Sequence, residues 1–451
     1  MIKVLLIAYD NGSHIHFPPH GLMYLTSVLQ KQKIHVDIWQ QDIEHYPAEK
    51  LTEYLDMNNY DIVGLGFIAG YYQYKVAKQL AAAVNASKNR GAFSFILGGH
   101  GPAAAPKFFM NKLESDSVFV GESILSIIDY INCAEEGVYE CDHLVNPDYL
   151  PLPAFKSFPM KIYRLIRWPT SKTTDFCFPV LSGMGCKWSC SFCYRMDKGF
   201  RPRTAESVID EISYLWRNYR INHFQFSDEL FMSSEKRVLH FCEKMLESPL
   251  IQEIKDFKYD CNGRLNFAKP DVLRIMKKSG CEYVNYGIES LNKEVLNNIK
   301  KGLTAEMIVQ GVEFTLAAGL SPGINFMWGN IGDTPETLEE AADFIIKYNP
   351  GHELRTIRPV TPYPGSPLFD EAIKRGLVDD VEDFYENKHV NSDLISCNFM
   401  DLSTDEAHNL LYKANLRIMQ AHYEKVRGEV NRESFNCYMG CNNGFRGFRS
   451  V

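Results

Sequence analysis

Three cysteines on one short stretch are the residues best placed to do chemistry. Cys186, Cys190 and Cys193 follow a CxxxCxxC spacing directly after the apolar run Phe178 to Leu181. This spacing predicts three thiolates on one loop at the end of a strand. A cubane iron-sulfur cluster usually takes four thiolates, so such a loop leaves one iron open. An open iron can chelate a small molecule and pass it an electron, whereas a fully ligated cluster can only relay electrons.

Two other interpretations of the cysteines are a zinc loop and three buried free thiols. A zinc site needs a fourth ligand and normally comes as paired CxxC knuckles. Free buried cysteines are common, but three at this spacing beside Gly185 and an aromatic residue are not. The pattern therefore favours a [4Fe-4S] cluster.

The same stretch resembles the signature of the radical S-adenosylmethionine (SAM) enzymes through Cys186, Cys190, Phe192 and Cys193. The resemblance implies that the open iron binds the amino and carboxylate groups of SAM. It also implies that Phe192 packs near the adenine of SAM. An external one-electron reductant, such as flavodoxin or ferredoxin, is a further implication.

The elements that must position this loop begin at Asp175, where apolar strands and amphipathic helices alternate. The alternation resembles a partial (β/α)6 TIM-type barrel, whose active site lies at the carboxyl ends of the strands. After the strand that leads into the cysteine loop, the predicted strands are His223 to Phe226, Phe257 to Cys261, Tyr283 to Ile288, Ile324 to Trp328 and Arg355 to Val360.

Polar side chains at the ends of these strands match the groups of SAM. The Glu289 carboxylate can accept hydrogen bonds from a ribose diol, and the Arg264 guanidinium matches a carboxylate with two parallel hydrogen bonds. The alternative is that such residues are charges at a barrel end that pair with one another. The predicted SAM contacts are Phe192, Tyr194, Ser227, Asp228, Glu229, Arg264, Glu289 and Ser290.

The first third of the chain also alternates strand and helix, which predicts a Rossmann-like, doubly wound parallel sheet that binds ligands at its carboxyl edge. Glycine-rich loops follow these strands, and glycine lets the backbone approach a ligand closely. A glycine after a strand is also what any such turn needs. The predicted strands are Lys3 to Tyr9, Val36 to Trp39, Asp61 to Phe67, Ser94 to Leu97 and Ser117 to Val120.

Together with the barrel that follows, these loops resemble the cobalamin-binding domain of the cobalamin-dependent radical SAM enzymes. No Asp-x-His-x-x-Gly motif occurs, so the resemblance implies base-off cobalamin without a histidine ligand from that motif. His14, His16 and His20 lie in the first loop, where they could approach the cofactor. The predicted cobalamin contacts are Asn11, Gly12, Gly66, Phe67, Gly70, Gly98, Gly99, His100, Gly121 and Glu122.

Two of these loops depart from the family pattern. The family's Gly-Gly-Pro-His-Pro turn is replaced by the run 98–102, with the sequence Gly-Gly-His-Gly-Pro. The family's acidic Gly-Glu-Gly-Glu is shortened to Gly-Glu-Ser at 121–123.

Composition limits the partners. The 451 residues carry a net charge of -8 with no long run of like charges, so nothing resembles a nucleic-acid footprint. The apolar start Met1 to Ala8 is too short for a membrane span and lacks a small-residue cleavage site. Twelve scattered cysteines fit a reducing compartment. These features predict a cytoplasmic protein with a small-molecule or peptide substrate.

The chain is expected to divide into four parts: a cobalamin-binding domain at 1–132, a proline-punctuated linker at 133–174, the barrel at 175–368 and a mainly helical C-terminal domain at 369–451. In the last part, Thr404 to Val426 is a predicted amphipathic helix. The tail contains Cys437 and Cys441, which could ligate an auxiliary metal or form a redox pair. We expect the tail instead to fold over the barrel mouth.

The function that the resemblance implies is cobalamin-dependent radical SAM methylation of an inert carbon or phosphorus centre, with a carbon atom favoured. A non-methylating rearrangement, ring contraction, cyclisation or sulfur insertion remains an alternative, and so does a cobalamin or SAM sensor. A transfer RNA methylthiolating enzyme is disfavoured because the first third has only Cys133 and Cys141, too few for a second cluster. The sequence does not define the substrate.

Overall fold

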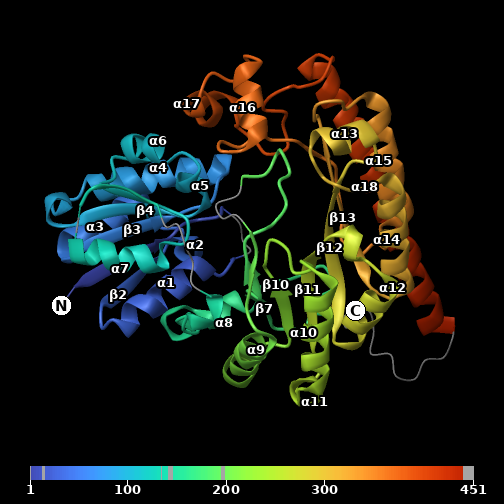
Figure 1. Ribbon diagram of the computed structural model, residues 1–451, viewed down its shortest axis with the longest axis horizontal. Helices are drawn as coiled ribbons and strands as arrows, with labels where there is room; N and C mark the ends of the chain where they lie inside the picture. The colour runs from blue at the N-terminus through green and yellow to red at the C-terminus, as the bar shows by residue number, and fades with distance from the viewer. Residues whose placement is uncertain (1, 13–15, 134, 141–145, 195–198, 440–451) are drawn as a thin grey trace.

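The computed structural model describes residues 2–12, 16–133, 135–140, 146–194 and 199–439 (Figure 1). Two parallel six-stranded sheets, one in the N-terminal part of the chain and one in the barrel, account for its architecture. Long helices at the C-terminal end complete it. The predicted α/β class, with a Rossmann-like sheet, a partial barrel and a helical end, is confirmed.

The N-terminal sheet has the strand order β2-β1-β3-β4-β5-β6, and every pair in it is parallel. Its central strands are apolar and buried on both faces, as parallel strands covered by helices should be. One of its strands, β6, lies within the segment 133–174 and was not predicted. The strands are β1 (Lys3–Ala8), β2 (His35–Gln40), β3 (Ile62–Gly66), β4 (Ser94–Gly98), β5 (Ser117–Val120) and β6 (Gly137–Glu140).

Helices cover both faces of this sheet. On one face, α1 and α7 pack against the sheet through Leu25, Leu29 and Ile127. On the other face, α3, α4 and α6 pack through side chains that include Leu55 and Phe109. The helices are α1 (His20–Lys31), α2 (Gln41–Glu44), α3 (Ala48–Met57), α4 (Tyr71–Asn85), α5 (His100–Ala103), α6 (Pro106–Lys112) and α7 (Ser123–Cys133).

The second sheet has the order β14-β13-β12-β11-β10-β7 and is also parallel throughout. Because β7 and β14 are not paired with each other, the barrel stays open. The short hairpin of β8 (Gly183–Met184) and β9 (Arg201–Pro202) follows β7. The strands are β7 (Cys177–Val180), β10 (His223–Phe226), β11 (Lys258–Gly263), β12 (Cys281–Glu289), β13 (Ser321–Trp328) and β14 (Arg358–Pro359).

Capping residues start the helices of the barrel. Thr204 accepts a hydrogen bond from the backbone N–H of Ser207, and Thr334 forms a capping box with Thr337. The helices of the linker and barrel are α8 (Met160–Tyr163), α9 (Ala205–Tyr219), α10 (Glu235–Glu247), α11 (Leu250–Glu253), α12 (Pro270–Lys278), α13 (Lys293–Asn298), α14 (Ala305–Ala317) and α15 (Pro335–Tyr348).

The C-terminal part joins the two sheets. It comprises α16 (Pro367–Lys374), α17 (Val381–Asp383), a π-helix at Phe384–Lys388 and α18 (Thr404–Met439). The segment 360–399 shares one hydrophobic core with α3, α4 and α6, whereas α18 packs along α15 of the barrel. Figure 1 shows α16 and α17 between the N-terminal sheet and the barrel.

The last helix is longer than predicted. It covers the predicted range 404–426 and continues to Met439, so Cys437 lies in a helix. Cys441 and the rest of the tail lie outside the described residues, and so does their predicted place over the barrel mouth. Within the described part of the chain, none of the helices combines the length and the apolar character that a membrane crossing needs.

Candidate functional site

The cysteine loop follows β7 and β8 at the carboxyl end of the barrel strands. Cys190 is buried, Cys186 is partly buried and Cys193 is exposed. Backbone hydrogen bonds hold the loop on two sides, because Ser191 donates to the carbonyl of Ile299 and accepts from the N–H of Leu368. The loop is therefore fixed by the barrel and by the start of α16 together.

The protein environment raises the pKa of two of these thiols, Cys186 and Cys193. Although Cys193 is exposed, desolvation by the surrounding protein atoms, followed by the neighbouring Cys190 thiol, raises its pKa to about 12, and Lys301 opposes the change. Burial also raises the pKa of Cys186. Among the described residues, no three His, Cys, Asp or Glu side chains converge closely enough to hold a single metal ion. A cubane is ligated at separate irons, so its thiolates do not need to converge on one point.

Arg264 lies beside these cysteines, directly after β11. Its guanidinium stacks on the Trp188 ring at 3.8 Å from the ring centroid, and the nearby Cys190 opposes the lowering of its pKa by burial. The side chain is 6% exposed, and its Nε and Nη2 groups have no partner among the described residues. A buried donor without an acceptor is costly, so these N–H groups are suited to a bound anion.

Glu289 ends β12 in a strained backbone conformation. Its φ of 71° is left-handed, and the pairing of β12 with β13 shifts register between Gly287 and Glu289. The carboxylate is buried and forms an ion pair with Lys301, with 2.9 Å between Oε1 and Nζ. A Cβ atom at Gly287 would lie 2.4 Å from this carboxylate oxygen, so a side chain there would displace the carboxylate. Such strain is typical of functional sites.

The residues after β10 divide into two kinds. Ser227 and Glu229 are exposed, whereas Asp228 is 1% exposed. Asp228 accepts hydrogen bonds from the N–H and hydroxyl of Ser182, at 2.6 and 2.5 Å, and has Arg237 at 3.5 Å. Its carboxylate therefore holds the segment after β7 by hydrogen bonds, while Ser227 and Glu229 face the space above the strands.

The other predicted SAM contacts lie around the same loop. Phe192 has the Lys301 ammonium 5.7 Å from its ring centroid. Tyr194 packs against Gly365, where a Cβ atom would lie 2.7 Å from the ring. Ser290 is buried and accepts a hydrogen bond from the N–H of Asn292, which places it at the start of the α13 segment.

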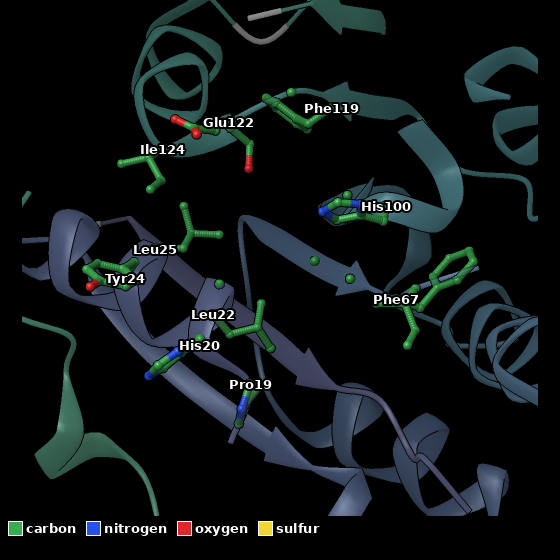
Figure 2. A pocket seen from close by; sticks show the side chains of 18 of the residues that line it. Pro19, His20, Leu22, Tyr24, Leu25, Phe67, His100, Phe119, Glu122 and Ile124 are labelled. Carbon is green, nitrogen blue, oxygen red and sulfur yellow. The ribbon is translucent and has the colours of Figure 1, made fainter. Parts of the chain in front are cut away.

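A cavity of about 490 Å³ lies between the carboxyl edge of the N-terminal sheet and the ends of β7 and β10 (Figure 2). Its lining is mostly apolar and comes from β1, α1 and the loops after β3, β4 and β5. On the barrel side it reaches Gly185, next to Cys186. The predicted residues that line it are Gly66, Phe67, Gly98, Gly99, His100, Gly121, Glu122, Ser227, Asp228 and Glu229.

Three predicted cobalamin contacts lie outside this cavity. The backbone N–H groups of Asn11 and Gly12 are bonded to the carboxylates of Asp42 and Asp10, at 3.0 and 2.6 Å. Gly70 precedes α4, where an added Cβ atom would meet the Gln73 side chain. The structure gives these three residues local roles in turns.

The histidines of the first loop have separate environments. His14 is outside the described residues, and His16 hydrogen-bonds to the Asp42 carbonyl at 3.0 Å. His20 lines the cavity, and burial, followed by the charge of Arg203, lowers its pKa to about 4. Its ring lies edge-on to Phe178 at 5.6 Å, so the imidazole is neutral and packed toward β7.

The cavity edge has room for a ligand where the glycines face it. At Gly98 an added Cβ atom would have no neighbour within 4 Å, so the backbone is bare toward the cavity. Gly99 has a φ of 93°, and a Cβ atom there would lie 2.7 Å from the Phe67 carbonyl oxygen. Only glycine fits this turn, and a flat ligand can approach the backbone closely.

None of the sequence patterns above indicates Lys301, Trp188 or Arg201 as part of the site. Arg201 in β9 pairs with Glu122, with 2.5 Å between Nη2 and Oε1, and so links the barrel to the loop after β5. The partners of Lys301 and Arg201 are distant in sequence, so spacing carries no signal for them. Trp188 lies between two cysteines of the motif, so its position in the sequence could have indicated that it belongs to the site.

Comparisons with known proteins agree with this architecture. Residues 180–345 match the radical SAM superfamily. An uncharacterized methyltransferase of Pyrococcus horikoshii is 27% identical over 412 residues, which cover 84% of each chain. The anaerobic magnesium-protoporphyrin IX monomethyl ester cyclase of Rubrivivax gelatinosus is 25% identical over 411 residues, or 84% of this chain and 70% of the cyclase.

Solved structures show the same fold. One is the radical SAM methyltransferase TsrM from Kitasatospora setae with cobalamin and a [4Fe-4S] cluster bound, which has a TM-score of 0.63 at 17% identity. The match covers 83% of this chain and 78% of TsrM. The cobalamin-dependent radical SAM enzyme OxsB has a TM-score of 0.69 at 16% identity, covering 91% and 66%. Part of this chain, residues 180–345, is therefore similar to the radical SAM superfamily, and the chain has the fold of cobalamin-dependent enzymes of that superfamily.

Proposed function

We propose that this chain is a cobalamin-dependent radical SAM methyltransferase that methylates an unactivated carbon of a small molecule or peptide. The proposal rests on one continuous cavity, which joins the glycine loops of the N-terminal sheet to the strand that leads into the cysteine loop. A cofactor held on the sheet and a cofactor held on the cysteine loop would then act on one substrate between them.

The cysteine loop would hold the cluster through Cys186, Cys190 and Cys193. When bound, a cluster with one open iron supplies an electron to SAM, and cobalamin supplies the methyl group. The Arg264 donors lie beside the loop and would bind the SAM carboxylate, and the Glu289 carboxylate would accept hydrogen bonds from the ribose diol. Lys301 holds that carboxylate in place.

The loops after β3, β4 and β5 would hold cobalamin in the base-off form, without a histidine from an Asp-x-His-x-x-Gly motif. Their bare glycine backbone at Gly98 offers a surface for a flat ring, and Phe67 and His100 stand beside it (Figure 2). His20 is neutral and packed on β7. These side chains and the apolar lining would exclude water from the space where a reactive substrate forms.

The test is anaerobic reconstitution of the full chain with iron, sulfide, hydroxocobalamin and SAM, in the presence of a one-electron reductant. We expect retained corrin absorption together with 5'-deoxyadenosine and S-adenosylhomocysteine. The triple variant C186A/C190A/C193A should lose the iron and both products, while C133A, at an exposed cysteine at the end of α7, should keep them. Both products from the triple variant would refute the assignment of the cluster.

A non-methylating reaction is the second candidate, because the cyclase of Rubrivivax gelatinosus aligns with most of this chain. The same reconstitution separates the two. Corrin with 5'-deoxyadenosine alone, without S-adenosylhomocysteine, would favour a rearrangement or cyclisation of the substrate over methyl transfer.

A further inference from the structure

Two cations lie buried next to the predicted cluster cysteines, and they differ in their partners. Lys301 is 2.9 Å from the Glu289 carboxylate, so this pair is neutral as a unit. Arg264 is 6% exposed, and no carboxylate among the described residues forms an ion pair with it. Arg264 is therefore a buried positive charge that the neighbouring carboxylates leave uncompensated.

The position of this charge is set by stacking on an aromatic ring of the cysteine loop. The guanidinium lies 3.8 Å from the centroid of Trp188, a residue between two of the cysteines. Gly302 approaches the same group, with 3.5 Å between an added Cβ position and Nη2. The Nε and Nη2 groups keep unused donors in this buried space.

Such an arrangement acts on a cluster through its charge. A cubane held by three thiolates is an anion, and reduction by one electron adds one more negative charge to it. A buried cation and N–H donors at the ligand sulfur stabilise the more negative form, and both raise a reduction potential. In a buried site this effect is screened less than at the surface.

We propose that Arg264 tunes the reduction potential of the cluster upward and so makes the cluster reducible before SAM binds. The inference rests on the proposed function, since it needs a cluster on Cys186, Cys190 and Cys193. Arg264 is a tuning and positioning residue in this role, and its contact with the SAM carboxylate is a separate property that the test below distinguishes.

The test is a redox titration of the reconstituted full chain without SAM, followed by the electron paramagnetic resonance signal of the reduced cluster. R264Q removes the charge and most of the donors, and we expect a midpoint potential more negative than that of the wild type. R264K keeps the charge but loses the planar stack, so a smaller shift in the same direction is expected.

A matched control is R164Q. Arg164 also stacks on an aromatic ring, with 3.9 Å to the centroid of Phe176, and donates to the Tyr219 carbonyl, but it contacts no cysteine of the loop. Its variant should load iron and show the wild-type potential. An equal shift in R164Q and R264Q would mean that lost arginine stacking anywhere in the barrel causes the change.

Other outcomes overturn the inference in distinguishable ways. A wild-type potential in R264Q, with weaker SAM binding by calorimetry, would leave Arg264 as an anchor for the SAM carboxylate alone. If R264Q takes up no iron, R264M, which keeps an apolar stem without the charge, is the second variant, and a wild-type potential in R264M would show that the arginine only holds the loop. A wild-type protein that takes up no cluster under these conditions would instead refute the proposed function.

Discussion

Replacing Lys301 with methionine is expected to destabilise the barrel, because it leaves the Glu289 carboxylate buried without a cation. The two side chains are 8% and 9% exposed, and Nζ lies 2.9 Å from Oε1. At an effective dielectric constant near 20, the attraction at this distance is about 6 kcal/mol. Desolvation offsets part of it, and removing one partner of a buried pair costs about 3–5 kcal/mol. We expect a loss of that size in K301M.

The assay is urea unfolding of the protein without cofactors, followed by intrinsic fluorescence and circular dichroism. The double variant E289Q/K301M buries no charge, so it should recover most of the loss, and a double-mutant cycle then gives the coupling between the two groups. K347M removes an exposed lysine from α15 and should change the free energy of unfolding by less than about 0.5 kcal/mol.

Two results would refute this reasoning. If K301M is as stable as K347M, the pair contributes nothing to folding and Glu289 is accessible to water. If E289Q/K301M is no more stable than K301M, the loss comes from packing of the lysine stem and not from an unpaired carboxylate.

Three further predictions follow from other parts of the structure. G98L should weaken cobalamin binding by roughly tenfold to a hundredfold, because its side chain enters the cavity. G91L places the same side chain at an open position of the surface and should not weaken binding. Retention of cobalamin on gel filtration measures both. His223 is buried, which lowers its pKa, but hydrogen bonds to nearby carboxylates outweigh burial and raise the pKa to about 10. Its contribution to stability should therefore be complete below about pH 6.5 and lost as the pH rises to 10. In urea unfolding, the free energy of unfolding of H223Q should depend less on pH over this range than that of the wild type. Hydrogen bonds from Lys78 and other donors lower the pKa of Glu386 to about 2, so its contribution to stability is present above about pH 4.5 and lost as the pH falls toward 2. Because the group is partly exposed, E386Q should lower the free energy of unfolding at neutral pH by only about 1 kcal/mol.

Outcomes that contradict these predictions are equally specific. Equal corrin retention in G98L and G91L would show that the cavity is not the cobalamin site. A wild-type stability that does not fall between pH 6.5 and 10, or a variant H223Q with the same fall, would assign the alkaline loss to other groups. An E386Q protein as stable as the wild type would mean that Tyr74 and Lys78 find other acceptors.

Much of this fold could be predicted because its signals are local. Parallel strands buried on both faces are continuous apolar runs, and Thr204 and Thr334 mark helix starts by their own chemistry. The strand β6 carries no such signal. It is four residues long, lies at the sheet edge and is mostly partly exposed, so no apolar run marks it.

The candidate site was predictable where one residue type suffices for a role. Thiolates at cluster spacing and glycines after strands are visible in the sequence. The ion pairs Glu289–Lys301 and Glu122–Arg201 are not, because each depends on where loops distant in sequence meet in the fold. That Asn11, Gly12 and Gly70 lie outside the cavity was also not visible in the sequence, since a glycine-rich turn has the same composition whether it faces the cavity or only closes a loop.

The segment 360–399 has a consequence for chimeric proteins. Its side chains Phe384, Tyr385 and Phe399 belong to the hydrophobic core of the N-terminal sheet, although they follow the barrel in sequence. An exchange of residues 1–132 between relatives would therefore leave a mismatched surface under this segment. A functional graft must carry both pieces from the same parent, even though the linker and the barrel strands, at 133–359, separate them in sequence.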